Sequence, residues 1–359
     1  MQTLPLGTSL QGGKYIIKGV LGQGGFGITY LASHTIFGYD VAIKEFFIKQ
    51  YCEREETSTL VNVSTLSNIG EVRRYEEKFL KEAQIINKLD HPNIIKIHDV
   101  FRENNTAYYV MDYIDGESLS HMISRRGALP EREALAYIRQ AGRALAYIHS
   151  MHLNHLDVKP ANLMCINQTG RIVLIDFGMS KQYDTISGDQ TSTTPVGISH
   201  GYAPIEQYQE GGVREFSPQT DIYALGATLY KLVTGQTPPP ASDIINQGLP
   251  QLPTSISAST QQTIAQAMSL RKDKRQSTVH DFLSSLKDPE TKPAVPTYKK
   301  VLAKLVYALS IIAGLFTVFA IYAAFTGDLQ PYAVMPPAII CKGLWSWAES
   351  LQRGHVKSH

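Results

Sequence analysis

The sequence predicts an α+β fold with two lobes, followed by a single transmembrane helix. Residues 15–113 contain short β-branched and aromatic runs separated by Gly, Asn and Asp, a pattern typical of an antiparallel sheet. Residues 116–286 instead place apolar residues at three- and four-residue steps, which indicates amphipathic helices. Residues 305–326 form a run of 22 residues without a charge. A small strand-rich lobe therefore precedes a larger helical lobe, and a membrane span follows both.

The composition narrows the classes of partner and compartment. The chain of 359 residues carries 34 basic and 32 acidic residues and no long block of like charges, so nucleic acid is not an expected partner. Its three cysteines lie far apart and predict neither a zinc site nor a disulfide framework. The N-terminus contains no export signal. The two lobes are therefore expected in a reducing compartment.

The first lobe, residues 15–113, is expected to combine a sheet with one helix. Residues 1–14 precede it as an N-terminal extension, and a polar, Ser/Thr-rich insert over 46–71, to which the sequence assigns no chemistry, leads into the helix. Apolar residues at helical spacing place this helix at 72–89, before His91 and Pro92. The predicted strands span 15–22, 27–32, 40–47, 94–101 and 106–114.

The second lobe, residues 116–286, is expected to be mostly helical. Apolar residues at helical spacing predict helices over 131–150, 220–235 and 260–270. Residues 287–304 are rich in proline and are interpreted as a juxtamembrane linker.

The apolar run at 305–326 has the length of a membrane span, roughly 33 Å at 1.5 Å per residue. The alternative is a buried core helix, but such helices seldom contain more than about 20 apolar residues. Three lysines within 299–304 flank its N-terminal side, and the first basic residue beyond it is Lys342. The positive-inside rule then predicts a single-pass protein of the cell membrane, with both lobes cytoplasmic and the tail 327–359 outside.

A glycine-rich segment lies between the first two predicted strands. Gly22, Gly24 and Gly27 follow the pattern G-x-G-x-x-G, which lets a backbone approach phosphates without interference from Cβ atoms. Dinucleotide-binding folds share this spacing, but there a helix follows the glycines. Here a strand follows, so the segment is expected to cover the phosphates of a nucleotide.

Lys44 and Glu82 are two charged residues in apolar surroundings. Lys44 lies in a strand that otherwise looks buried, and Glu82 lies on the apolar face of the predicted helix. Each would be costly to bury unless it met an opposite charge. Taken separately, either side chain is more simply interpreted as solvated, but together they predict an ion pair beside the phosphates.

Asp157, Lys159 and Asn162 lie within six residues of a predicted loop, and Asp176 follows the strand pattern RIVLI. A carboxylate, a cation and an amide in this arrangement can hold a hydroxyl, a phosphoryl group and a metal. Carboxylate and amide oxygens are ligands that Mg²⁺ prefers, so Asn162 and Asp176 are the candidate metal ligands.

These motifs together resemble the eukaryotic-like (Hanks-type) protein kinase family, in its bacterial transmembrane serine/threonine form. LGQGGFGIT, VAIK, Glu82, HLDVKPAN and DFG occur in the order and at the distances of that family, over residues 15 to about 286. The resemblance implies a two-lobed kinase fold, with ATP as substrate and Mg²⁺, or Mn²⁺ in its place, as cofactor.

The resemblance also implies the role of individual residues. Asp157 would accept the proton of the attacking hydroxyl, and Lys159 would steady the γ-phosphate and mark a Ser/Thr kinase. Asp221 would brace the catalytic loop, and Glu206 would pair with Arg275. The implied ATP-binding residues are Leu21, Gly22, Gln23, Gly24, Gly25, Phe26, Gly27, Thr29, Ala42, Lys44, Glu82, Met111, Asp112, Ile114 and Met164.

The sequence departs from the family pattern next to the catalytic aspartate. Leu156 stands where the family usually has arginine, so the cation that would read a phosphorylated activation segment is missing. Ser199 replaces the usual threonine that faces the substrate. The Ser and Thr residues at 191–194 could be autophosphorylated or could be solvated loop residues.

The expected function is therefore a membrane-anchored serine/threonine protein kinase, with proteins and the kinase itself as substrates and with homodimerisation left open. One alternative is a pseudokinase scaffold that binds nucleotide or partners without phosphotransfer. Retention of Lys44, Asp157 and Asp176 disfavours it. Another is a phosphotransferase for small molecules, which the combination of VAIK, HLDVKPAN and YAPIEQY disfavours.

Overall fold

The structure is a computed structural model, and it divides the chain into two compact units, Met1–Pro289 and Glu290–His359. In the first unit it describes residues 2–25, 27–56, 58–177, 181–182, 199–208 and 215–288. In the second unit it describes only residues 308, 309, 311, 312 and 315.

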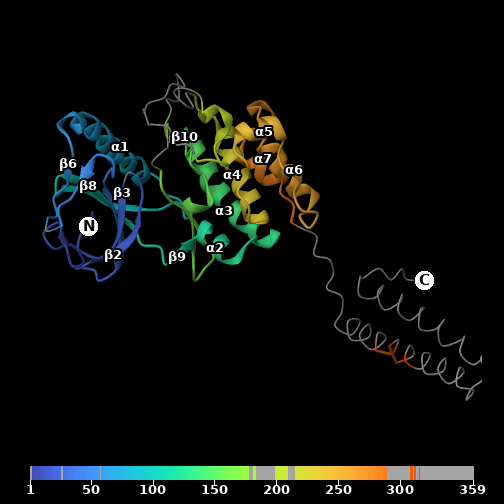
Figure 1. Cartoon of the computed structure of the whole chain (residues 1–359), viewed down its shortest axis with the longest axis horizontal. Coiled ribbons are helices and arrows are strands. Elements are labelled where there is room, and N and C mark those ends of the chain that lie inside the picture. The colour runs from blue at the N-terminus through green and yellow to red at the C-terminus, as the bar shows by residue number, and fades with distance from the viewer. Residues whose placement is uncertain are drawn as a thin grey trace, which may run out of the picture. The chain divides into compact units, whose positions relative to one another are not determined.

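The first unit has two lobes, and the smaller one is built on a six-stranded antiparallel sheet (Figure 1). Its hairpins follow from local sequence. Asn104 and Asn105, both at positive φ, form the two-residue turn between the two strands of this sheet that come last in sequence. In spatial order the strands are β1 (Ser9–Leu10), β2 (Tyr15–Gln23), β3 (Gly27–His34), β4 (Asp40–Phe46), β8 (Thr106–Asp112) and β7 (Ile97–Glu103).

Helix α1 (Ile69–Asn87) packs against this sheet, after a short 3₁₀ turn η1 (Leu66–Asn68). It buries Val72, Phe79 and Ala83, the apolar positions that predicted the helix, and Phe79 stacks on Tyr109 of β8. The helix begins three residues earlier and ends two residues earlier than the predicted 72–89. The sequence therefore placed the helix and its buried face correctly.

The insert between β4 and α1 has a structure of its own. It contains a short antiparallel hairpin, β5 (Cys52–Glu53) and β6 (Asn62–Val63). Beside it, the buried Arg54 forms an ion pair with the fully buried Glu45 of β4 and donates to the carbonyl oxygen of Gln2 at 2.7 Å. Tyr30 and Tyr108 also donate to Glu45, at 2.8 and 2.6 Å. The insert thus joins the sheet to the N-terminal segment.

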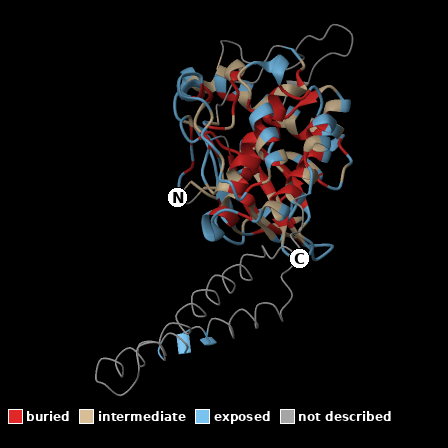
Figure 2. Ribbon diagram, turned by 90° about the vertical axis from the view of Figure 1, so that its right-hand side faces the viewer, coloured by how far each residue is buried: buried red, intermediate tan, exposed pale blue. Residues whose placement is uncertain are grey.

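The larger lobe is mostly helical, as predicted, and α4 is buried along most of its length. Figure 2 shows buried residues gathered in the interior of the first unit, with exposed residues around them. Helix α4 packs against α3 and α6, and a Cβ atom at Gly226 would lie only 2.6 Å from that of Ala267. The helices are α2 (Leu119–Arg126), α3 (Glu131–Ser150), α4 (Pro218–Thr234), α5 (Ala241–Gln247), α6 (Ala258–Ala267) and α7 (Val279–Ser285), with the 3₁₀ turn η4 (Lys272–Lys274).

Short strands and turns lie between the sheet and the helices. They form a three-stranded sheet, in the order β12-β11-β9, and the pair β10 and β13. A Cβ atom at Gly116 would lie only 2.1 Å from the carbonyl oxygen of Cys165. Strand β9 can therefore pair with β11 only if residue 116 is glycine. The elements are β9 (Gly116–Ser118), β10 (Leu153–Asn154), η2 (Pro160–Asn162), β11 (Leu163–Ile166), β12 (Ile172–Leu174), β13 (Lys181–Gln182) and η3 (Ile205–Tyr208).

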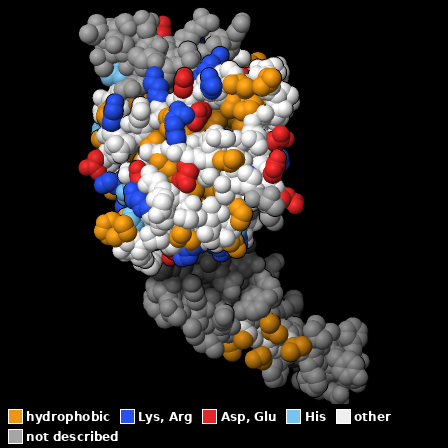
Figure 3. Space-filling view, turned by 90° about the vertical axis from the view of Figure 1, so that its left-hand side faces the viewer, with side chains coloured by type: hydrophobic (Ala, Val, Ile, Leu, Met, Phe, Trp, Pro, Cys, Tyr) orange, Lys and Arg blue, Asp and Glu red, His pale blue; other side chains and the backbone are white. Residues whose placement is uncertain are grey.

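The smaller lobe exposes several large hydrophobic side chains. Ile36 and Phe37, at the tip of the β3–β4 hairpin, are 77% and 70% exposed, and Leu6 is 74% exposed. Figure 3 shows the hydrophobic side chains of this face in separate patches, with Lys, Arg, Asp and Glu between them. Scattered apolar residues of this kind are normal on a protein surface, so they do not test homodimerisation, which the sequence left open.

The predicted membrane span lies almost wholly outside the described residues. Of 305–326, only Ala308, Leu309, Ile311, Ile312 and Leu315 are described, and all five are helical and exposed. Among the described residues no helix has both the length and the apolar character needed to cross a membrane. The tail 327–359 and nearly all of the linker 287–304 also lie outside the described residues.

Candidate active site

Lys44 joins the two lobes. Strand β4 carries Lys44, α1 carries Glu82, and Asp176 follows β12 of the larger lobe. The Lys44 Nζ atom lies 3.5 Å from Glu82 Oε1 and 3.1 Å from Asp176 Oδ1. Tyr109 of β8 donates a hydrogen bond to Glu82 Oε1 at 3.1 Å. The ion pair predicted from sequence is present, and the structure adds a second carboxylate to it.

The charges in this group stabilise one another in partly desolvated surroundings. Burial by itself lowers the pKa of Lys44, but Asp176 and then Glu82 raise it well above its usual value, so Lys44 is a cation at neutral pH. Burial raises the pKa of Glu82, and Lys44 offsets this only in part. Lys44 thus provides a fixed positive charge beside the glycine-rich loop.

The glycine-rich loop crosses close above Lys44. The Gly24 N–H donates to the Gly27 carbonyl oxygen at 2.9 Å, which closes the tip of the β2–β3 hairpin. A Cβ atom at Gly27 would lie 2.7 Å from the Glu45 carbonyl oxygen and 3.7 Å from Lys44 Cγ and Cε. Only glycine allows this approach. Phe26, at the tip, lies outside the described residues.

The expected adenine-binding residues come from three neighbouring segments. Ala42 of β4 pairs with Met111 of β8, and Met164 belongs to β11. The Asp112 N–H donates to the Lys96 carbonyl oxygen at 3.1 Å, and the Asp112 carboxylate contacts His98 at 2.6 Å. Of the polar groups of Asp112, the backbone carbonyl therefore remains as the one suited to contact adenine. The other predicted contacts, Leu21, Gly22, Gln23, Gly25, Thr29 and Ile114, lie on β2, the loop, β3 and the hinge.

The Asp157 carboxylate is held by three side chains. Ser199 Oγ donates to Asp157 Oδ1 at 2.6 Å, Asn162 Nδ2 donates to Oδ2 at 2.9 Å, and Lys159 Nζ lies 2.8 Å from Oδ2. Lys159 also donates to Ser199 Oγ at 2.9 Å. The sequence singled out Ser199 only as a replacement for threonine, and the structure shows that its hydroxyl reaches the Asp157 carboxylate.

Hydrogen bonds to Asp221 of α4 hold the backbone of the catalytic loop. The fully buried Asp221 accepts hydrogen bonds from the backbone N–H groups of His155 and Leu156, at 2.9 and 2.8 Å, and from Asn154 Nδ2 at 3.0 Å. Burial by itself would raise the pKa of Asp221, but hydrogen bonding to His149 and the other donors lowers it. The implied brace is therefore present. Asn154 was missed because nothing in its sequence context marks it beyond its place before the motif.

Asn162 and Asp176 offer oxygen atoms that fit a magnesium ion. The Ile175 N–H donates to the Asn162 carbonyl oxygen at 3.0 Å, which brings the end of β12 next to η2. Because the Asn162 amide nitrogen contacts Asp157, its Oδ1 atom is left to face a ligand. Asp176 adopts φ 60°, and its side chain is 45% exposed. A carboxylate and an amide oxygen are hard donors of the kind that Mg²⁺ prefers.

The end of the activation segment is anchored to the helical core. Glu206 of η3 forms an ion pair with the buried Arg275, with distances of 2.6 and 3.1 Å, as the resemblance implied. Thr220 Oγ1 also donates to Glu206 at 3.1 Å. The next residue, Gln207, donates from Nε2 to the Leu156 carbonyl oxygen at 2.9 Å. Sequence reasoning found the ion pair and missed Gln207.

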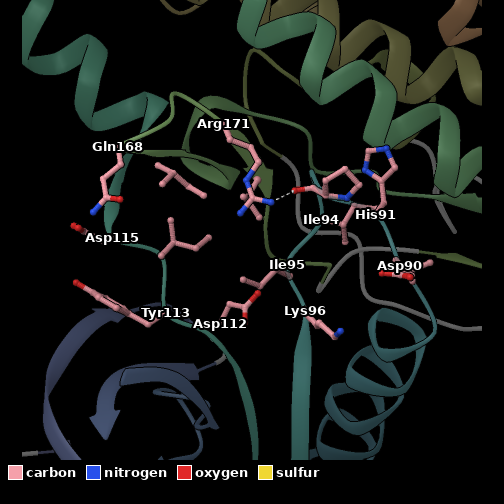
Figure 4. Close-up of a pocket in the computed structure, with 15 residues that line it drawn as sticks. Asp90, His91, Ile94, Ile95, Lys96, Asp112, Tyr113, Asp115, Gln168 and Arg171 are labelled. Atoms are coloured by element: carbon pink, nitrogen blue, oxygen red, sulfur yellow. Dashed lines mark hydrogen bonds between the residues drawn. The ribbon is translucent and has the colours of Figure 1, made fainter. Parts of the chain in front are cut away.

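A separate cavity of about 560 Å³ lies behind the hinge (Figure 4). It is lined by 89–92, 94–96, the hinge 112–115 and the β11–β12 hairpin, and not by Lys44, Asp157 or Asp176. Arg171 points into it and donates to the Pro92 carbonyl oxygen at 3.1 Å. The cavity therefore adjoins the far side of the hinge and takes no part in the phosphate site.

Comparison with known proteins agrees with this geometry. The family model described as protein kinase domain matches residues 15–303, most of the chain. The chain belongs to the protein kinase domain family. The family match extends beyond residue 286, where the sequence predicted the end of the domain.

Bacterial serine/threonine-protein kinases are among the relatives. PrkC of Bacillus subtilis is 33% identical over 226 residues, which cover 63% of this chain and 31% of PrkC. PknA of Corynebacterium glutamicum is 30% identical over 277 residues, covering 74% of this chain and 53% of PknA. The chain thus spans about a third to a half of the length of these relatives. A solved structure, the PpkA-294 apo form, matches with a TM-score of 0.67 and 26% identity, covering 80% of this chain and all of PpkA-294.

Proposed function

We propose that this protein transfers the γ-phosphoryl group of ATP to serine or threonine hydroxyls of proteins. The observation that carries the proposal is the link from Lys44 to both Glu82 and Asp176. This link brings the ATP-binding lobe and the lobe of the catalytic loop into the arrangement that phosphoryl transfer needs. The relatives named as serine/threonine-protein kinases support the choice of hydroxyl.

Asp157 is the proposed catalytic base. The Ser199 hydroxyl already lies 2.6 Å from its carboxylate, so a substrate hydroxyl can be held at the same oxygen. The hydroxyl oxygen would attack the γ-phosphorus, the bond from the γ-phosphorus to the bridging oxygen would break to release ADP, and the proton would pass to Asp157. Lys159 is placed to stabilise negative charge on the transferred group. Mg²⁺ or Mn²⁺ at Asn162 and Asp176 would neutralise phosphate charge.

Phosphate transfer by the full chain in detergent tests this proposal. Incubation with Mg·[γ-³²P]ATP and a basic protein substrate should label Ser or Thr, on the substrate or on the kinase itself. Lys44→Met and Asp157→Asn should abolish the label, whereas Lys96→Met, which changes an exposed lysine, should retain it. ATP binding by the wild type without any transfer would favour the pseudokinase scaffold instead.

We also propose that residues 305–326 anchor the kinase in the cell membrane, with the lobes in the cytoplasm and the tail 327–359 outside. This proposal is supported by the uncharged run itself and by the lysines that precede it. Cys341 in the tail provides a test, because Cys52 and Cys165 are buried. Added to intact cells, a membrane-impermeant thiol reagent should label the wild-type kinase. The Cys341→Ser variant should stay unlabelled. Labelling that requires cell lysis would contradict the orientation.

A further inference from the structure

We propose that Gln207 is a positioning residue that fixes the catalytic loop without a phosphate on the activation segment. The inference rests on the proposed function and concerns how that active site is assembled. The starting point is Leu156, which is buried and stands directly before Asp157. Its apolar side chain cannot make the ionic contact through which a phosphorylated segment would hold the loop.

Leu156 needs support from its surroundings. Its φ angle is 65°, in the left-handed region that a residue with a branched side chain rarely adopts. Both of its backbone polar groups are held by side chains from elsewhere in the lobe. The N–H donates to Asp221 at 2.8 Å, and the carbonyl oxygen accepts from Gln207 Nε2 at 2.9 Å. Asp221 holds the peptide group that precedes Leu156, and Gln207 holds the one that follows it.

Gln207 is itself held in place. Its side chain is 3% exposed, and its own N–H donates to the Pro204 carbonyl oxygen at 3.0 Å. Its neighbour Glu206 is fixed by the buried Arg275. A continuous set of contacts therefore runs from the helical core through η3 to the peptide before Asp157. The Gln207 side-chain amide makes its contact with the Leu156 carbonyl oxygen without a formal charge. This contact therefore needs no phosphate as a counter-charge.

The same short segment contacts the catalytic loop a second time, at the Asp157 carboxylate. Ser199 donates to Asp157 Oδ1, and its carbonyl oxygen accepts from the N–H groups of Tyr202 and Ala203, at 2.9 and 3.0 Å. Residues 199–208 thus hold the loop at Asp157 and at Leu156 together. Two hydrogen bonds from uncharged side chains do what a phosphate and an arginine would otherwise do.

A glutamine-to-methionine pair of variants in the full-length protein tests the inference. Gln207→Met keeps the side-chain length but removes the donor, so the Leu156 carbonyl loses its partner. Gln261→Met is the matched control, because Gln261 Nε2 also donates to a backbone carbonyl, that of Ile256 at 2.8 Å, in a part of the lobe away from the loop. The value of kcat should fall about tenfold in Gln207→Met alone, with KM for ATP unchanged.

Two further measurements separate a positioning role from a general loss of stability. Amide hydrogen exchange over residues 154–162 should be faster in Gln207→Met and unchanged in Gln261→Met. Wild-type kinase treated with a phosphatase, which is then removed, should transfer phosphate at the untreated initial rate and without a lag. If Gln207→Met does not fold, Gln207→Asn, which withdraws the donor by one methylene, should show the same changes.

The outcomes are distinct. Wild-type kcat and wild-type exchange in Gln207→Met would overturn the inference, and so would a lag in the phosphatase-treated wild type. If the wild type itself transfers no phosphate, the proposed function fails. In that case, only the amide hydrogen exchange of residues 154–162 in Gln207→Met decides whether Gln207 holds the loop.

Discussion

Lys44 and Asp157 are held in different ways. Lys44 contacts two carboxylates, Glu82 of α1 in its own lobe and Asp176 of the opposite lobe, and the second contact depends on the relative position of the lobes. Asp157 belongs to a loop whose backbone is bonded to Asp221 of the buried helix α4 and to Gln207. Assembly of the first group therefore requires that the lobes come together, whereas the second is part of the core of one lobe.

Replacing Asp221 should give the largest effect, because it removes the support of the catalytic loop. Asp221→Asn keeps the shape but places an amide N–H₂ group where backbone donors need an acceptor. The free energy of unfolding should fall by about 3 kcal/mol, and activity should fall with it. Urea unfolding followed by circular dichroism measures this, with the exposed Asp243→Asn as control. Equal stability of the two variants would contradict a fixed loop.

In the smaller lobe, the buried ion pair between Arg54 and Glu45 anchors the insert to β4, and Arg54→Met should break this pair. The substitution leaves Glu45 buried without its cation, and breaking such a pair should cost about 2–3 kcal/mol of stability. Arg125→Met, which breaks the exposed pair with Glu117, should change stability little. Thermal unfolding compares the two variants directly. A stability loss no greater than that of Arg125→Met would show that the insert is not anchored through Arg54.

Glu82→Gln should separate activity from stability. Burial raises the pKa of Glu82, so removing its charge costs the fold little, and Asp176 still contacts Lys44. We expect a fall of roughly 10- to 100-fold in kcat/KM, with a change in unfolding free energy below about 1 kcal/mol. Glu77→Gln, on the exposed face of the same helix, is the control. A large loss of stability in Glu82→Gln would instead show that the Lys44–Glu82 contact is needed for the stability of the fold.

The smallest predicted effect is a pH dependence that comes from His155. Burial lowers the pKa of His155 below its usual value of 6.5, so the unfolded chain binds its proton more readily than the folded protein does. Stability should therefore decrease as the pH falls below about 6.5, with a slope of up to about 1.4 kcal/mol per pH unit. Urea unfolding between pH 5 and 7.5 should show a smaller slope in His155→Phe. Identical slopes would exclude this contribution.

Local sequence patterns predicted most of the fold. Helix α3 spans Glu131–Ser150, as its apolar periodicity predicted, and β2 and β3 begin at the predicted residues. The elements that begin furthest from their predictions are β7, which starts at Ile97 rather than at residue 94, and α1, which starts at Ile69 rather than at residue 72. These patterns succeed because each element buries one face, and the spacing of its apolar residues records that face.

The candidate site was predictable where chemistry is carried by short motifs. The sequence named Lys44, Glu82, Asp157 and Asp176, and the structure brings the first two together with Asp176. It assigned no role to Gln207 and none to the insert around Arg54. Gln207 lies in the motif YAPIEQY, but the resemblance implied a role there only for its neighbour Glu206. Arg54 lies in a polar segment without a distinctive pattern, so no local signal marks it.

By itself the sequence determined the two lobes and the order of their elements, and it named the residues expected to bind ATP, because these follow from periodicity and from motifs of a few positions. Only the tertiary structure decided that Arg54 meets Glu45, that Ser199 meets Asp157 and that Gln207 meets Leu156. These residues lie 9, 42 and 51 positions apart. Their contacts depend on how whole elements pack, since burial makes each unpaired polar group costly and only the packed chain determines which groups are buried.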